Sequence, residues 1–132
     1  MIKGVEKLVH LETLTLAVNL KQEFKANELA LKIGKLVNLR FLNISTNYIS
    51  DEGAVYLTNL KQLETLICGQ TLITGKGLVT LSRNLPELRK LSLFGGLYDE
   101  TKGKPMMRDD DLVEFNLNNP EITHLTICKN SH

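Results

Sequence analysis

Tryptophan is absent from the 132-residue sequence, and cysteine, proline and aromatic residues are scarce: there are two cysteines, three prolines and 5% aromatic residues. Two cysteines are too few for the disulfide framework of a small secreted domain. The N-terminal segment lacks the apolar run of a secretory signal peptide, and no stretch approaches the roughly 18 apolar residues of a membrane span. We therefore expect a cytoplasmic protein, in its own cell or in a host cell, without a membrane partner.

An excess of charge of one sign is lacking too. Sixteen basic and 15 acidic residues leave a net charge of +1, and no run of Lys or Arg exceeds two residues. A nucleic-acid partner would call for clustered positive charge, so none is expected.

Clusters of reactive side chains are equally scarce. The three histidines, at positions 10, 124 and 132, are scattered. His124 and Cys128 lie on one predicted strand about 13 Å apart, too far for a Cys–His nucleophile pair or shared zinc coordination. We expect no catalytic residue, no metal site and no cofactor, and hence a protein that is not an enzyme.

What the sequence does contain is one pattern repeated along the chain. A segment of the form L-x-x-L-x-L, with Ile or Cys sometimes in the last place, opens at residues 11, 39, 63, 88 and 122. Each of the first four is followed by a turn and then by apolar residues at helical spacing. A period of this length indicates a solenoid, in which every repeat buries its apolar sides against its neighbours.

The two periodicities locate the elements of each repeat. Strands are predicted near 13–16, 41–44, 65–68, 90–93 and 124–127, and helices near 27–36, 51–59, 76–84 and 110–118. Asn27 and Asp51 are expected to cap the helices that begin beside them. The run Asp109–Asp111 is expected to complement the partial positive charge at a helix start rather than to bind a cation.

Two segments depart from the repeat. Residues 1–8 resemble the end of a helix, because Val5 and Leu8 match the apolar spacing of the later helices. A polar insertion at 97–106, with a Gly and a Pro, separates the fourth strand from its helix. It is either a tolerated surface loop or a binding loop.

Over nearly the whole chain these residues resemble the leucine-rich repeat family. The segment 47–57, of the form N-x-I-x-D-E-G-A-x-x-L, is similar to the 24-residue bacterial GALA-like repeat and to the ribonuclease-inhibitor type. The resemblance implies an α/β solenoid of one domain, 1–132, with a parallel sheet on the concave face and helices on the convex face. It also implies an inward-turned residue after each strand, which bonds neighbouring backbone: Asn19, Asn47, Thr71, Gly96 and Asn130. Since Gly96 has no side chain, the solenoid should be weakest there.

The outward side chains of the strands form the predicted binding surface. They are mostly neutral, with apolar residues expected to be exposed among small polar ones, and this mixture suits a protein partner. Isolated exposed apolar residues are also ordinary on protein surfaces, so the family resemblance carries much of this prediction. The predicted contact residues are Phe41, Asn43, Thr65, Ile67, Lys90, Ser92, Phe94, His124 and Thr126.

We therefore predict a non-enzymatic protein–protein interaction module that uses the concave sheet and flanking loops. The bacterial repeat type suggests a bacterial effector or its repeat domain. One alternative is an activator of a GTPase or another enzyme that offers an arginine to phosphates, with Arg40, Arg83, Arg89 and Arg108 as the choices. Another is a structural segment of a longer solenoid. Neither end shows a cap, so self-association through the uncapped ends is expected, with the strand edge at 122–130 favoured.

Overall fold

Strands and helices alternate along the chain, as the repeat predicts. The computed structural model describes residues 3–94, 98–99, 104–105 and 109–128. Its elements are η1 (Val5–Lys7), β1 (Thr13–Thr15), α1 (Glu23–Ile33), β2 (Phe41–Asn43), α2 (Asp51–Leu57), β3 (Thr65–Ile67), α3 (Gly75–Asn84), β4 (Lys90–Phe94), β5 (Tyr98–Asp99), β6 (Lys104–Pro105), α4 (Asp109–Asn118) and β7 (His124–Cys128).

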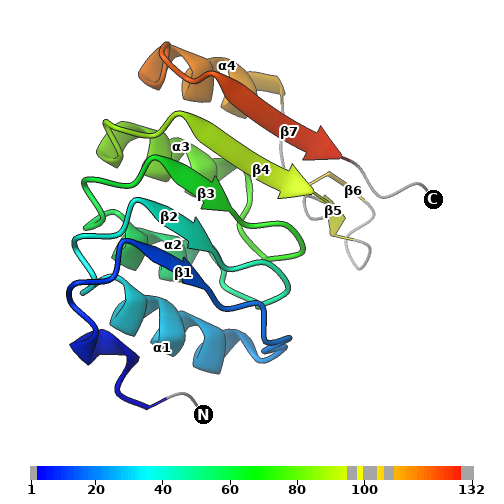
Figure 1. Ribbon diagram of the computed structural model, residues 1–132. Coiled ribbons are helices and arrows are strands. Elements are labelled where there is room, and N and C mark those ends of the chain that lie inside the picture. Colours follow the sequence, from blue (N-terminus) through cyan, green and yellow to red (C-terminus); the bar gives the residue numbers. More distant parts are fainter. Residues whose placement is uncertain (1–2, 95–97, 100–103, 106–108, 129–132) are drawn as a thin grey trace.

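Five of the strands form one parallel sheet in the order β1-β2-β3-β4-β7. The helices form a second layer behind this sheet, and the repeats rise one above another from β1 to β7 (Figure 1). This arrangement confirms the predicted α/β leucine-rich-repeat solenoid. In the insertion, β5 and β6 pair antiparallel outside the main sheet.

Helix α1 and the N-terminal segment differ from their predicted extents. Helix α1 ends at Ile33, three residues before the predicted end. Helix α1 begins at Glu23, four residues before the predicted start, because Ala26 already belongs to the buried stripe that continues through Leu29, Ala30 and Ile33. Spacings of three and four residues place all four side chains on one helical face. At the N-terminus, the expected helical segment is only the short 3-10 turn η1, which buries Val5 against α1.

The core lies between the sheet and the helix layer. The central leucines of the strands, Leu14, Leu42, Leu66, Leu91 and Leu125, stand in register from one strand to the next. Leu42 and Leu66 are fully buried. Burying a leucine contributes about 1.5–3 kcal/mol, so stacking successive repeats stabilises each of them.

The inward-turned asparagine is present where the repeat is most regular. The Asn47 side chain is fully buried, donates to the carbonyls of Leu16 and Ile44, and accepts from the Leu20 N–H at 3.1 Å. The hydroxyl of Thr71 donates to the Cys68 carbonyl at 3.0 Å. It also accepts from the Ile73 N–H at 3.4 Å, so it satisfies two backbone groups, both within its own repeat, whereas Asn47 also reaches the preceding repeat.

The other residues that were expected to turn inward after a strand differ from the prediction. Asn19 is exposed and has a positive φ of 55°, so it does not turn inward. It belongs to the first repeat, where no earlier strand of the described chain offers a backbone carbonyl. Gly96 and Asn130 lie outside the described residues.

The expected caps act on a different helix from the one predicted. Asn27 lies within α1 and accepts from the Ser50 N–H at 3.0 Å, and Ser50 precedes α2. Asp51, in the first turn of α2, accepts from the Thr74 N–H at 2.8 Å, and Thr74 precedes α3. Both side chains therefore tie one repeat to the start of the next helix. The run Asp109–Asp111 does lie in the first turn of α4, as predicted.

Candidate functional site: the outward face of the sheet

The parallel register brings the predicted contact residues together. Phe41, Thr65, Lys90 and His124 occupy one position in four successive strands, and Asn43, Ile67, Ser92 and Thr126 occupy another. In the first strand, Thr13 and Thr15 extend the two columns. Phe94 pairs with Cys128 through the backbone, but its side chain lies outside the described part of the structure.

The face is less apolar at its surface than predicted. Lys90, His124 and Thr126 are exposed, whereas Phe41 and Ile67 are only half-buried rather than freely exposed. Strands in a sheet lie about 4.8 Å apart, so Thr13 and Thr65 on either side cover part of Phe41. The result is a shallow neutral surface and not a row of projecting aromatic rings.

The size of this face limits what it can hold. Four gaps between five strands give a width of roughly 19 Å, and even the longest strands, β4 and β7 with five residues each, are only about 17 Å long. The resulting flat area of about 300 Å² is below the roughly 800 Å² that each partner buries in a standard interface. A stably bound partner must therefore also touch the loops at the ends of the strands.

A ladder of opposite charges borders the face where the strands begin. Glu12, Arg40, Glu64 and Arg89 directly precede β1, β2, β3 and β4. Arg40 forms an ion pair with Glu64 and a longer one of 3.8 Å with Glu12. The hydrogen bond that Arg40 donates to Glu64, and then the negative charge of Glu64, raise the pKa of Arg40.

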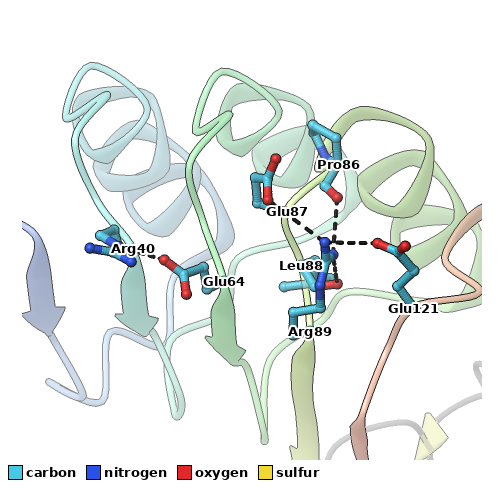
Figure 2. Close-up of polar contacts among 7 residues, drawn as sticks. All are labelled: Arg40, Glu64, Pro86, Glu87, Leu88, Arg89 and Glu121. Atoms are coloured by element: carbon cyan, nitrogen blue, oxygen red, sulfur yellow. Dashed lines mark hydrogen bonds and ion pairs between the residues drawn. The ribbon is translucent and has the colours of Figure 1, made fainter.

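Arg89 makes polar contacts with more residues than Arg40 does (Figure 2). Its guanidinium reaches Glu121 at 2.9 Å and Glu87 at 3.7 Å, and it donates to the carbonyls of Pro86 and Leu88 at 3.1 Å each. Such exposed pairs add little stability, but they fix the arginine side chains in place.

Arg83, another arginine named from the sequence, does not join this face. Arg83 forms an ion pair with Glu114, which connects α3 to α4 in the helix layer. Arg108 lies outside the described residues. The three described arginines, Arg40, Arg83 and Arg89, are thus all paired with glutamates.

The described residues contain neither a metal-binding cluster of His, Cys, Asp or Glu side chains nor a helix long and apolar enough to cross a membrane. His124 is exposed, and its Nδ1 lies 2.9 Å from the Thr123 hydroxyl. The one described cysteine side chain, Cys68, is buried in the position that Leu93 occupies in the next repeat.

One feature of the helix layer was not predicted. Phe24 is 82% exposed, and it borders a groove of about 550 Å³ between α1 and α2. The groove is also lined by Glu23, Asn27, Glu28, Leu31, Glu52 and Tyr56. Sequence patterns placed Phe24 before the helix; once α1 begins at Glu23, the ring lies on its exposed side. In the sequence, Ala26 stands three and four residues before Leu29 and Ala30, and this helical spacing could have indicated the earlier start of α1.

Comparison with known sequence families finds no match, and comparison with curated proteins finds no similar sequence. The GALA-like or ribonuclease-inhibitor-like type of the repeat therefore stays a prediction.

Solved structures, in contrast, show clear similarity. One is the leiomodin-1 domain described as actin-binding site 2, with a TM-score of 0.68 and 11% identity over 97% of this chain and 76% of that one. Another is the C-terminal domain of tropomodulin from Caenorhabditis elegans, with a TM-score of 0.68 and 13% identity over 96% of this chain and 80% of that one. At these identities the likeness establishes the fold, and the chain is an α/β leucine-rich-repeat solenoid similar to these two domains.

Proposed function

We propose that the chain is a non-enzymatic module that binds a protein partner through the concave sheet and the loops beside it. The observation that carries this proposal is the register of the five strands, which joins the outward side chains into one continuous neutral surface. Half-buried Phe41 and Ile67 among Thr, Ser and Asn side chains form the mixture that protein interfaces favour.

Actin is the first partner that we propose to test. The leiomodin-1 domain that shares this fold is described as an actin-binding site. A similar fold does not by itself imply the same binding partner. The general proposal is therefore a protein partner, and actin is the specific partner to test first. A role as a bacterial effector stays a prediction from the repeat type alone.

Activation of a GTPase or another enzyme is the weaker alternative. An activating arginine must reach a partner's phosphates, where it stabilises developing charge. Arg40 and Arg89, which border the candidate face, are instead paired with glutamates of neighbouring repeats. Releasing either one would break its ion pairs with these glutamates.

Binding of monomeric and filamentous actin to matched variants would test the proposal. Two variants alter the face: Phe41→Ala combined with Phe94→Ala, and Lys90→Glu. Two controls make the same chemical changes on α1 at exposed positions, Phe24→Ala and Lys25→Glu. We expect at least a tenfold loss of affinity in both face variants, unchanged affinity in both controls, and unchanged circular dichroism in all four.

Other results would redirect the proposal. Loss of binding in Phe24→Ala with full binding in the face variants would move the site to the groove between α1 and α2. If the wild-type chain does not bind actin in either form, the actin form of the proposal is wrong.

A further inference from the structure

The groove between α1 and α2 carries charge of one sign. Glu23 and Glu28 of α1 and Glu52 of α2 line it and are exposed, and no Lys or Arg is among its described lining residues. In the next repeat, Lys76 of α3 takes the place that Glu28 and Glu52 have in the two preceding helices. The negative charge therefore belongs to this groove and not to the helix layer as a whole.

Apolar side chains lie among these carboxylates. Phe24 is 82% exposed, and Leu31 and Tyr56 are 42% and 37% exposed. Phe24 and Leu31 are separated by two helical turns, so they lie on the same side of α1. Exposed apolar residues that gather along a groove, with polar residues beside them, mark a binding surface more often than scattered ones do.

Contacts between the two helices fix the shape of the groove. Asn27, which also lines it, accepts from the Ser50 N–H at 3.0 Å and donates to the Ser50 hydroxyl at 2.9 Å. Gly34 directly follows α1, and a Cβ there would lie only 2.3 Å from the Tyr56 carbonyl oxygen. Because η1 packs against α1 and α3 packs against α2, the groove lies within the stack of repeats (Figure 1).

We infer that this groove binds a short basic amphipathic helix of a partner protein. Lysine or arginine side chains of that helix offset the like charges of the three glutamates, and its apolar side chains cover the three exposed apolar residues. From Glu23 to Leu31 the lining side of α1 rises about 12 Å, at about 1.5 Å per residue, which matches roughly two turns of a bound helix. Apolar anchors at i, i+4 and i+7 fit this length. An anionic partner would be repelled by the same carboxylates.

Binding should be weak and sensitive to salt. The charges are exposed, and a helix of a few turns buries little surface, so we expect a dissociation constant of about 1–100 μM that rises with ionic strength. The inference goes beyond the proposed function, because α1 and α2 lie behind the sheet and the outward sheet face stays free (Figure 1).

Fluorescence anisotropy with three labelled synthetic peptides tests the chemistry of the partner. The first is an amphipathic helix of about four turns, with leucines at i, i+4 and i+7 and lysines at most other positions. The second carries glutamate in place of every lysine. The third keeps the composition of the first but spreads its leucines around the helix. We expect the wild-type chain to bind the first peptide at least tenfold more tightly than either of the others.

Variants of the groove locate the site. Glu28→Gln combined with Glu52→Gln, and Phe24→Ala alone, should each weaken binding of the first peptide at least fivefold. Glu28→Lys combined with Glu52→Lys should shift the preference towards the second peptide. All three positions are exposed, so circular dichroism should stay unchanged.

Matched changes on α4 provide the controls. Asp109→Asn combined with Asp110→Asn removes two exposed carboxylates, and Leu117→Ala removes an apolar side chain that is 74% exposed. Both controls should bind the first peptide as the wild-type chain does. The inference is overturned if the wild-type chain binds none of the peptides, if it binds the first and third equally, or if the groove variants bind as tightly as these controls.

Discussion

Asp51 and Thr74 are joined across the boundary between two repeats: the carboxylate accepts from the Thr74 N–H at 2.8 Å and from its hydroxyl at 2.5 Å. Room for this carboxylate depends on a missing side chain. A Cβ atom on Gly77 would lie 2.2 Å from Asp51 Oδ1. One repeat earlier, Asn27 accepts from the Ser50 N–H, and a Cβ on Gly53 would lie 2.3 Å from Asn27 Oδ1. The glycines of the D-E-G-A type of segment thus make space for the preceding repeat.

Gly77→Ala should therefore lower the free energy of unfolding by about 1–3 kcal/mol, although alanine normally stabilises a helix interior by about 0.5–1 kcal/mol relative to glycine. Urea denaturation measures the change. In an Asp51→Ala background the same substitution should cost clearly less, because the crowded carboxylate is gone. Some cost should remain, because the new Cβ would still lie close to Ile73. A stabilised Gly77→Ala protein would contradict this account of the glycine.

Asn47→Ala should be among the most destabilising polar substitutions in the chain. It leaves the Leu16 and Ile44 carbonyls and the Leu20 N–H without their buried partner. Unsatisfied buried groups cost about 1–3 kcal/mol each, and partial relaxation reduces the sum, so we expect a loss of about 2–4 kcal/mol.

Asn19→Gly provides the control for this prediction. Asn19 is exposed and has a positive φ, which glycine also adopts without strain. Its free energy of unfolding should change by less than about 0.5 kcal/mol. Equal losses of stability in the two variants would show that the contribution of Asn47 does not depend on its burial.

Cys68 should be protected from thiol reagents in the folded chain. Burial raises the pKa of its thiol to about 12, from about 8.5 for a free cysteine. In a Cys128→Ser protein at pH 8, a disulfide reagent such as DTNB should label Cys68 only after unfolding in urea. Labelling of the native protein at the rate of the unfolded one would contradict its burial.

The same pKa shift predicts a dependence of stability on pH. The folded state keeps the Cys68 proton more tightly than the unfolded state does. The associated stability is therefore complete below about pH 8.5 and declines as the pH rises towards 12. Cys68→Ala should show a smaller loss of stability between pH 8.5 and pH 10 than the wild-type chain does, measured by urea denaturation at each pH.

Arg40→Ala should have only a small effect on stability, because its partners Glu12 and Glu64 are exposed charges in water. Ion pairs between exposed side chains are weak, so a double-mutant cycle of Arg40→Ala with Glu64→Ala should give a small coupling at low salt that shrinks at high salt. Coupling that is insensitive to salt would mean that the ladder is buried in solution, for example beneath a bound partner.

The sequence alone determined the solenoid and its register. Leucine at fixed spacing is a local signal, and stacking admits only the register in which Leu42, Leu66 and Leu91 share one buried layer. Once that register holds, the outward columns of the sheet follow from the alternation of side chains along a strand. The candidate face, from Phe41 to Thr126, was therefore predictable residue by residue.

Tertiary structure alone decided what passes between repeats. A cap motif in the sequence does not tell which helix it serves, because Asp51, in the first turn of α2, accepts from Thr74 at the start of α3. The half-burial of Phe41 and the exposure of Phe24 likewise depend on the neighbouring strand and helix, which lie 24 or more residues away along the chain. Packing between repeats joins residues that no local pattern connects, and for that reason only the folded chain shows that Asn27 reaches Ser50 and Asp51 reaches Thr74.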